Sequence, residues 1–200
     1  MRFLCASDFH ANFEWIEKII EIFKEKNADC LLYCGDFALK DYADIFLKEM
    51  NKNKIRTFAV PGNLDFDYEF ESEYAECSIY GIREFNGFLF LLMGASHPFI
   101  LEETLTEIKA TDCEKDKIVV VTHYPPLGIL DEVNGKHVGY EGYKKLDEEI
   151  KPLLHCFGHI HEAFGFKKIG ETTFINCAAA IGKRVYIFDT ETKEVEEVKL

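Results

Sequence analysis

The first half of the chain alternates between short apolar runs and segments with helical periodicity. Apolar runs over residues 2–7, 30–34 and 55–60 predict three buried strands. After the first run, Asn12 is placed to cap a helix, and the inner face of that helix is predicted to carry Phe13, Ile16, Ile20 and Phe23. After the second run, a helical face at i, i+3, i+4 and i+7 is formed by Ala43, Phe46, Leu47 and Met50. Strands alternating with helices indicate right-handed crossovers and a largely parallel sheet covered by helices.

The second half is richer in strand patterns. Residues 67–76 are rich in Glu and Tyr and predict a mostly solvated helix or loop, whereas residues 78–85 and 87–94 predict paired strands around Asn86 and Gly87. Further segments predict, in order, a weak helix around 101–108, a strand at 117–122, a helix at 143–150, a strand at 153–157, a hairpin at 163–177, and strands at 184–189 and 194–200. No repeat or long linker interrupts the series, so we expect one domain over residues 1–200, with two packed sheets flanked by helices.

Charge and composition narrow the possible partners. Thirty-six acidic and 23 basic residues give a net charge of −13, which disfavours binding to nucleic acids and anionic membranes. The longest apolar run, residues 88–95, is far shorter than the roughly 20 residues of a membrane-spanning helix. The N-terminal residues lack the regions of a signal peptide, and seven cysteines without a CxxC pair do not suggest a disulfide framework. We therefore expect a cytoplasmic protein without a membrane segment.

Five polar clusters stand where the predicted strands end. They are Asp8 with His10, Gly35-Asp36, Gly62-Asn63-Leu64-Asp65, His123, and Gly158-His159-Ile160-His161. In an extended segment alternate residues share a side, so Asp8 and His10 are expected to point together, as are His159 and His161. Ligands of α/β sheets bind at the carboxyl ends of strands. Mixed imidazole and carboxylate donors favour Mn, Fe, Ni, Co or Zn over a magnesium cage made only of oxygen.

The order of these clusters and the residues within them resemble the sequence motifs of the calcineurin-like metallophosphoesterase superfamily. The resemblance extends from Arg2 to about Ala179. The small archaeal and bacterial branch related to cyclic-nucleotide phosphodiesterases is the most similar in three segments, His123-Tyr124-Pro125-Pro126, His137-Val138-Gly139 and Gly158-His159-Ile160-His161-Glu162. The resemblance implies an α/β fold of the four-layer αββα sandwich type, with two mixed β-sheets flanked by helices. It also implies a dinuclear, metal-dependent phosphoric ester hydrolase.

The resemblance further implies a role for each ligand position. Asp8, His10 and His161 would hold one metal ion, Asn63, His123 and His159 would hold the other, and Asp36 would bridge them. The implied cofactors are two divalent transition-metal ions, with Mn favoured over Fe, Ni, Co or Zn. The implied reaction is in-line attack on phosphorus by a metal-bridging hydroxide, because two cations lower the pKa of water from about 15.7 towards roughly 7.

One position departs from the family pattern. The residue after Asn63 is commonly a histidine that assists the leaving group, and here it is Leu64. Loss of a positioned general acid typically costs about 10² to 10⁴ in rate. Either the substrates have acidic leaving groups or another side chain supplies the proton, and His97 and His137 are the histidines in polar loops without another assignment. His155, within an apolar run, is expected to be a hydrogen-bonded core residue. Asp65 is expected either to orient Asn63 or a loop amide or to cap a turn.

The favoured function is a phosphodiesterase acting on a small phosphorylated molecule, with a phosphomonoesterase as the nearest alternative. A third hypothesis, from another class, is a non-catalytic scaffold that uses the same fold to present a protein-binding surface. A nuclease is disfavoured by the charge. The substrate, the native metals, any protein partner, the general acid and the oligomeric state do not follow from the sequence.

Overall fold

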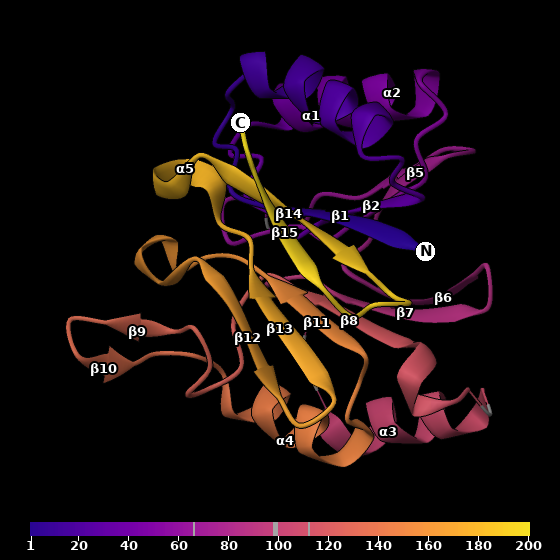
Figure 1. Cartoon of the computed structure of the whole chain (residues 1–200), viewed down its shortest axis with the longest axis vertical. Coiled ribbons are helices and arrows are strands. Elements are labelled where there is room, and N and C mark those ends of the chain that lie inside the picture. Colours follow the sequence, from indigo (N-terminus) through magenta and orange to yellow (C-terminus); the bar gives the residue numbers. More distant parts are fainter. Residues whose placement is uncertain (66, 98–99, 112) are drawn as a thin grey trace.

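Two β-sheets pack face to face between two pairs of helices in the computed structural model, which describes residues 1–65, 67–97, 100–111 and 113–200 (Figure 1). One pair of helices covers the outer face of the first sheet and the other pair covers the outer face of the second. The layers therefore follow the order helix, sheet, sheet, helix. The expected α/β class and four-layer αββα sandwich are confirmed.

The first sheet has a parallel centre with antiparallel additions. In spatial order its strands are β15 (Val195–Lys199), β14 (Arg184–Asp189), β1 (Arg2–Ala6), β2 (Cys30–Tyr33), β3 (Thr57–Ala59), β5 (Ala75–Cys77) and β4 (Phe70–Glu71). Strands β1, β2, β3 and β5 run parallel, while β14 pairs antiparallel with β1. The carboxyl ends of β1, β2 and β3 consequently lie along one edge.

The second sheet repeats this plan. Its order is β12 (Gly165–Ile169), β13 (Thr172–Asn176), β11 (Leu154–Phe157), β8 (Ile118–Thr122), β7 (Phe88–Met93) and β6 (Tyr80–Phe85). The four inner strands are parallel, and β12 and β6 close the edges as antiparallel hairpin partners. The amide of Ala179 donates to the carbonyl of Ser7 (3.0 Å), which joins the ends of β13 and β1 across the two sheets.

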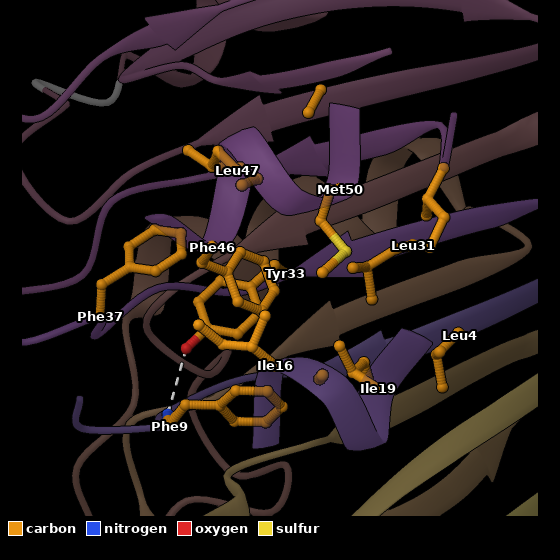
Figure 2. Close-up of a cluster of buried hydrophobic side chains, with 14 of the residues drawn as sticks. Leu4, Phe9, Ile16, Ile19, Leu31, Tyr33, Phe37, Phe46, Leu47 and Met50 are labelled. Carbon is orange, nitrogen blue, oxygen red and sulfur yellow. Dashed lines mark hydrogen bonds between the residues drawn. The ribbon is translucent and has the colours of Figure 1, made fainter. Parts of the chain in front are cut away.

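The helices arise from the periodic segments. Helices α1 (Glu14–Glu25) and α2 (Lys40–Lys52) cover the first sheet, α3 (Leu101–Ala110) and α4 (Glu141–Ile150) cover the second, and α5 (Ala179–Gly182) is a single turn. Short 3-10 turns, η1 (Lys115–Lys117) and η2 (His161–Ala163), precede β8 and follow β11. Figure 2 shows the aromatic part of the core under α1 and α2, where the Tyr33 hydroxyl accepts a hydrogen bond from the amide of Phe9 (3.1 Å). None of the helices in the described residues is long and apolar enough to cross a bilayer.

Two local predictions were wrong, and one element was missed. Residues 67–76 contain β4 and the start of β5 instead of a solvated helix or loop, because β5 pairs with β3 and buries Ala75 and Cys77. Phe13 precedes α1 and is 52% exposed, and the buried face of the helix is formed by Ile16, Ile19 and Ile22. A small hairpin of β9 (Glu132–Val133) and β10 (Lys136–His137) was not predicted.

Candidate metal centre

Seven polar side chains converge where strands of both sheets end. The loops after β1, β2 and β3 carry Asp8, His10, Asp36 and Asn63, while the ends of β8 and β11 lead into His123, His159 and His161. Hydrogen bonds between these loops hold the edge together, including the amide of Asp8 to Gly35 O (2.9 Å) and the amide of Gly158 to His123 O (3.0 Å). All seven residues that the sequence singled out as metal ligands therefore lie at one edge of the sandwich.

The first half of the cluster is centred on Asp8, whose side chain is fully buried. His161 Nε2 lies 3.0 Å from Asp8 Oδ1, and His10 Nε2 lies 3.7 Å from the same oxygen. The rings of His10 and His161 are perpendicular, with centroids 5.1 Å apart. One carboxylate oxygen and two imidazole nitrogens are thus spaced closely enough to hold one ion.

The second half is centred on Asp36 and His123. Asp36 Oδ1 lies 3.6 Å from His123 Nε2, and Asp36 Oδ2 lies 3.9 Å from His10 Nε2, so the two oxygens of this carboxylate face the two halves of the cluster. Asn63 Oδ1 lies 2.8 Å from His123 Nε2. His159 packs its ring against that of His123 with centroids 5.0 Å apart.

The hydrogen bonds of His123 test whether these residues fit a cation. Its Nδ1 lies 2.7 Å from the carbonyl oxygen of Cys34, and a carbonyl can only accept, so Nδ1 carries a proton. In the neutral ring the lone pair of Nε2 then faces the oxygens of Asn63 and Asp36. Three electron-rich atoms directed at the same space suit a divalent metal ion, with the second ring nitrogen fixed by a carbonyl as in many metal-binding histidines.

Burial and neighbouring charges shift the pKa values in this cluster. Burial by itself would raise the pKa of Asp8, but the neighbouring His10 ring and the hydrogen bond with His161 outweigh it, and the pKa lies below its ordinary value. Burial raises the pKa of Asp36, and the carboxylate of Asp8 adds to that rise although His123 opposes it. Burial also lowers the pKa of His159, which favours the neutral, ligand-competent imidazole. A cation between the two carboxylates would relieve their mutual repulsion.

The backbone at these positions differs from the expected extended geometry. Asp8, His10, Asp36 and His159 have φ values of 59°, 47°, 57° and 69°, in the left-handed region. The side chains converge because the loops turn sharply after each strand, and not because alternate residues of an extended segment share a side. A Cβ at Gly62 would collide with the Asp36 carboxylate, and one at Gly158 with that of Asp8. Glycine at these two positions lets backbone approach the carboxylates closely.

Asp65 ties two of the loops together. Its carboxylate accepts hydrogen bonds from the amides of Phe37 (2.9 Å), Ala38 (2.9 Å) and Gly62 (3.1 Å). Of the roles considered from the sequence, the structure supports binding of loop amides. The loop that carries Asp36 is thereby fixed relative to the loop that carries Asn63.

The remaining histidines are placed in three different settings. His155 is fully buried, between Asp147 and Thr122, which confirms the prediction of a core histidine. His97 stacks on the ring of Tyr80 with centroids 4.3 Å apart. His137 lies on β10, where its Nδ1 is 2.7 Å from Asp131 Oδ1. Among the described residues, neither His97 nor His137 hydrogen-bonds to or stacks on the seven clustered side chains.

Sequence reasoning missed Asp131, and it also left a group of thiols unplaced. Asp131 is fully buried, and the Asn134-Gly135 pair, which favours a two-residue hairpin turn, was the signal that could have located it.

Cys34, Cys156 and Cys177 meet between the sheets, with the Cys177 Sγ 3.6 Å from that of Cys156 and 3.7 Å from that of Cys34. Burial raises the pKa of the Cys34 and Cys156 thiols, as expected for thiols packed as small apolar groups.

Comparisons with known proteins agree with this geometry. The family model described as calcineurin-like phosphoesterase matches residues 1–163. A UPF0046 protein of Caenorhabditis elegans is 46% identical over 63 residues, which are 32% of this chain and 22% of that protein, so the chain spans less than a quarter of that relative. Two solved structures have the same fold: the TT1561 protein of Thermus thermophilus (TM-score 0.70, 14% identity, covering 99% of this chain and 98% of that one) and an archaeal phosphodiesterase (TM-score 0.56, 22% identity, covering 100% of both).

Proposed function

The chain belongs to the calcineurin-like phosphoesterase family, and from that premise we propose that it is a metal-dependent phosphoric ester hydrolase with a dinuclear centre. The observation that carries this proposal is the convergence of two buried carboxylates, four imidazoles and one amide oxygen at the carboxyl ends of strands from both sheets. The first metal site would use Asp8, His10 and His161. The second would use Asn63, His123 and His159, with Asp36 shared by both.

The donor set supports two transition-metal ions, with Mn first among Mn, Fe, Ni, Co and Zn. When bound, such ions would supply a water molecule of lowered pKa and Lewis-acid stabilisation of the phosphoryl oxygens. The protein's own contribution is positional. Asp65 fixes the two loops that carry Asp36 and Asn63, and the Cys34 carbonyl holds the His123 ring so that Nε2 faces the cluster.

Within this reaction class we propose a small phosphodiester as the substrate, with a phosphomonoester as the alternative. A diester brings one negative charge where a monoester brings up to two. Among the described residues, no lysine or arginine forms an ion pair with Asp8 or Asp36, and a substrate with one negative charge needs less compensation at this cluster than one with two. The fold shared with an archaeal phosphodiesterase adds weaker support.

The location of the protein is a further part of this proposal. All seven cysteines are free thiols, and six of them are buried. Free thiols persist in compartments that keep cysteine reduced. On that basis we propose the cytoplasm.

The proposal is tested with chelator-treated protein reloaded separately with Mn, Ni, Co, Zn or Mg. We expect about two ions per chain by elemental analysis, and faster turnover of bis(p-nitrophenyl) phosphate than of p-nitrophenyl phosphate. Asp36→Asn should lower both metal content and turnover, the latter by about 10² or more. Asp41→Asn, on the exposed face of α2, is the matched control and should change neither. Bound metal without hydrolysis of either ester would favour the scaffold hypothesis instead.

A further inference from the structure

A buried carboxylate organises the hairpin formed by β9 and β10. Asp131 is fully buried and accepts three hydrogen bonds, from the amides of Gly128 (2.9 Å) and Gly139 (2.8 Å) and from Nδ1 of His137 (2.7 Å). Because a carboxylate accepts only, the ring nitrogen that faces it must carry a proton. The pair therefore fixes the orientation of the His137 ring and places a proton on Nδ1, so a proton exchanged with a ligand would be the one on Nε2.

The other side of the His137 ring is open. The side chain is 55% exposed, whereas the side chain of Asp131 is fully buried. An imidazole with Nδ1 held by a carboxylate and Nε2 directed away from it is the arrangement that lets a histidine exchange a proton with a ligand. In the part of the chain that the structure describes, β9, β10 and the turn η2, which contacts β9, carry four other titratable or charged side chains, Glu132, Lys136, His161 and Glu162.

Hydrogen bonds connect the segments flanking the hairpin to the two loops of the second sheet that carry site residues, the loop after β8 and the loop after β11. The amide of Tyr140 donates to the carbonyl of Pro125 (2.8 Å), two residues after His123. The buried side-chain amide of Asn176 donates to the carbonyls of Leu130 (3.1 Å) and Ile160 (2.9 Å), and Ile160 lies between the two histidines of the last cluster. Strand β9 contacts η2, which begins at His161, and Figure 1 shows the hairpin projecting from one side of the molecule.

The position after Asn63 supplies no proton donor for the leaving group. Leu64 follows Asn63 and exposes 52% of its surface, and a leucine side chain cannot donate a proton. His97 is less suited than His137, because burial lowers its pKa and its ring is stacked on Tyr80. The hairpin that carries the carboxylate-held His137 contacts, through β9, the turn that begins at His161.

We propose that His137, oriented by Asp131, protonates the leaving-group oxygen of the substrate and that the natural substrates have poorly acidic leaving groups such as sugar or alkyl hydroxyls. This inference rests on the proposed hydrolase function. As the oxygen of water bonds to phosphorus, that water gives up one proton to solvent, the bond from phosphorus to the leaving oxygen breaks with its electron pair staying on that oxygen, and the proton on Nε2 of His137 moves to it. Solvent then returns a proton to His137.

The test is a series of methyl phosphodiesters of increasing leaving-group pKa, from nitrophenol through phenol to alkanol, assayed with metal-loaded protein. His137→Ala should slow the alkyl ester by about 10² to 10⁴ and the nitrophenyl ester by less than about threefold, because only a poor leaving group needs the proton. Asp131→Asn should show the same graded loss, by about tenfold for the alkyl ester. Added imidazole should restore part of the alkyl-ester rate of His137→Ala.

Lys136→Ala, a neighbouring exposed residue of the same hairpin, is the matched control and should leave the whole series unchanged. Metal content and thermal unfolding of each variant separate a proton-transfer defect from a structural one. Equal losses for all leaving groups, or no loss for the alkyl ester, would overturn the role of His137 while the hydrolase proposal stands. Wild-type protein that hydrolyses no member of the series would overturn both.

Discussion

Two histidine–carboxylate pairs in this fold have similar nitrogen–oxygen distances, but one is buried and the other lies at the surface. His155 and Asp147 lie 2.9 Å apart inside the second sheet, where the second ring nitrogen of His155 is 2.9 Å from the Thr122 hydroxyl. His137 and Asp131 lie 2.7 Å apart on the hairpin, where the ring is more than half exposed. A short distance between a carboxylate oxygen and a ring nitrogen therefore does not by itself mark a catalytic histidine. The surroundings of the second nitrogen separate a structural pair from one that can exchange protons.

The largest effect should follow from breaking the buried pair. His155→Leu leaves the Asp147 carboxylate, which is only 6% exposed, without its partner and should cost about 3–5 kcal/mol of unfolding free energy. His137→Leu should cost no more than about 1 kcal/mol, because the Asp131 carboxylate keeps hydrogen bonds from the amides of Gly128 and Gly139 and the lost ring was exposed. Urea unfolding of both variants measures the difference. Similar losses in the two would contradict the contrast between the pairs.

A double replacement sharpens the same contrast. Adding Asp147→Leu to His155→Leu removes the unpaired carboxylate as well as the ring, so much of the lost stability should return, with a coupling energy of about 2 kcal/mol. The corresponding double replacement of Asp131 and His137 should show weaker coupling, because Asp131 keeps two backbone donors when the ring is absent. A double-mutant cycle in urea gives both values. Additive losses at the buried pair would show that the two side chains do not depend on each other.

Thr122→Val probes the other end of the buried pair at nearly constant volume. The hydroxyl of Thr122 donates to the carbonyl of Tyr124 (2.7 Å) and contacts His155, so its loss should cost about 1–2 kcal/mol. The leaving-group dependence of any turnover should not change, in contrast to His137→Ala. A graded loss of rate in Thr122→Val would mean that the buried pair also takes part in proton transfer.

The smallest effect concerns pH. Burial by itself would raise the pKa of Asp131, but the amides of Gly128 and Gly139 and the ring of His137 outweigh it and hold the pKa below its ordinary value. A carboxylate with a lowered pKa stabilises the fold above its unfolded pKa of about 3.9 and loses that contribution as the pH falls through the folded value. Asp131→Asn should therefore lower the melting temperature by a few degrees at pH 6 and by less at pH 3. A difference that grows on acidification would reverse the assigned sign.

Much of the fold could be predicted from the sequence because its long elements have clear periods. The strands on either side of α1 and α2 and the pairing of β6 with β7 follow from runs of apolar side chains and from Asn86-Gly87. The two-residue strands β4, β9 and β10 could not be recognised in the same way, because two residues do not establish a period. Their pairing depends on neighbours that only the folded chain supplies.

The candidate site could be assembled from the sequence as a set of residues, although its geometry could not. Ligand-type side chains after apolar runs were enough to select Asp8, Asp36 and His123. The left-handed backbone at Asp8 and Asp36 is set by close contacts with other loops, and no local pattern reports it. For Asp131, the Asn134-Gly135 turn signal could have indicated the hairpin, but the contact of its carboxylate with a ring six positions further along is set by the folded loop.

The order of strands has a consequence for synthesis on the ribosome. Strand β1 lies between β2 and β14, and β11 lies between β8 and β13, so each sheet receives inner strands from the residues after the 1–163 segment that the family model matches. A nascent chain that has emerged only to that point exposes unpaired edges of β1 and β11, which invite pairing with other chains. Neither sheet can pair all its inner strands before β13 and β14 have left the ribosome. The yield of folded protein in the cell should therefore depend on the amount of available chaperone and fall when translation ends early.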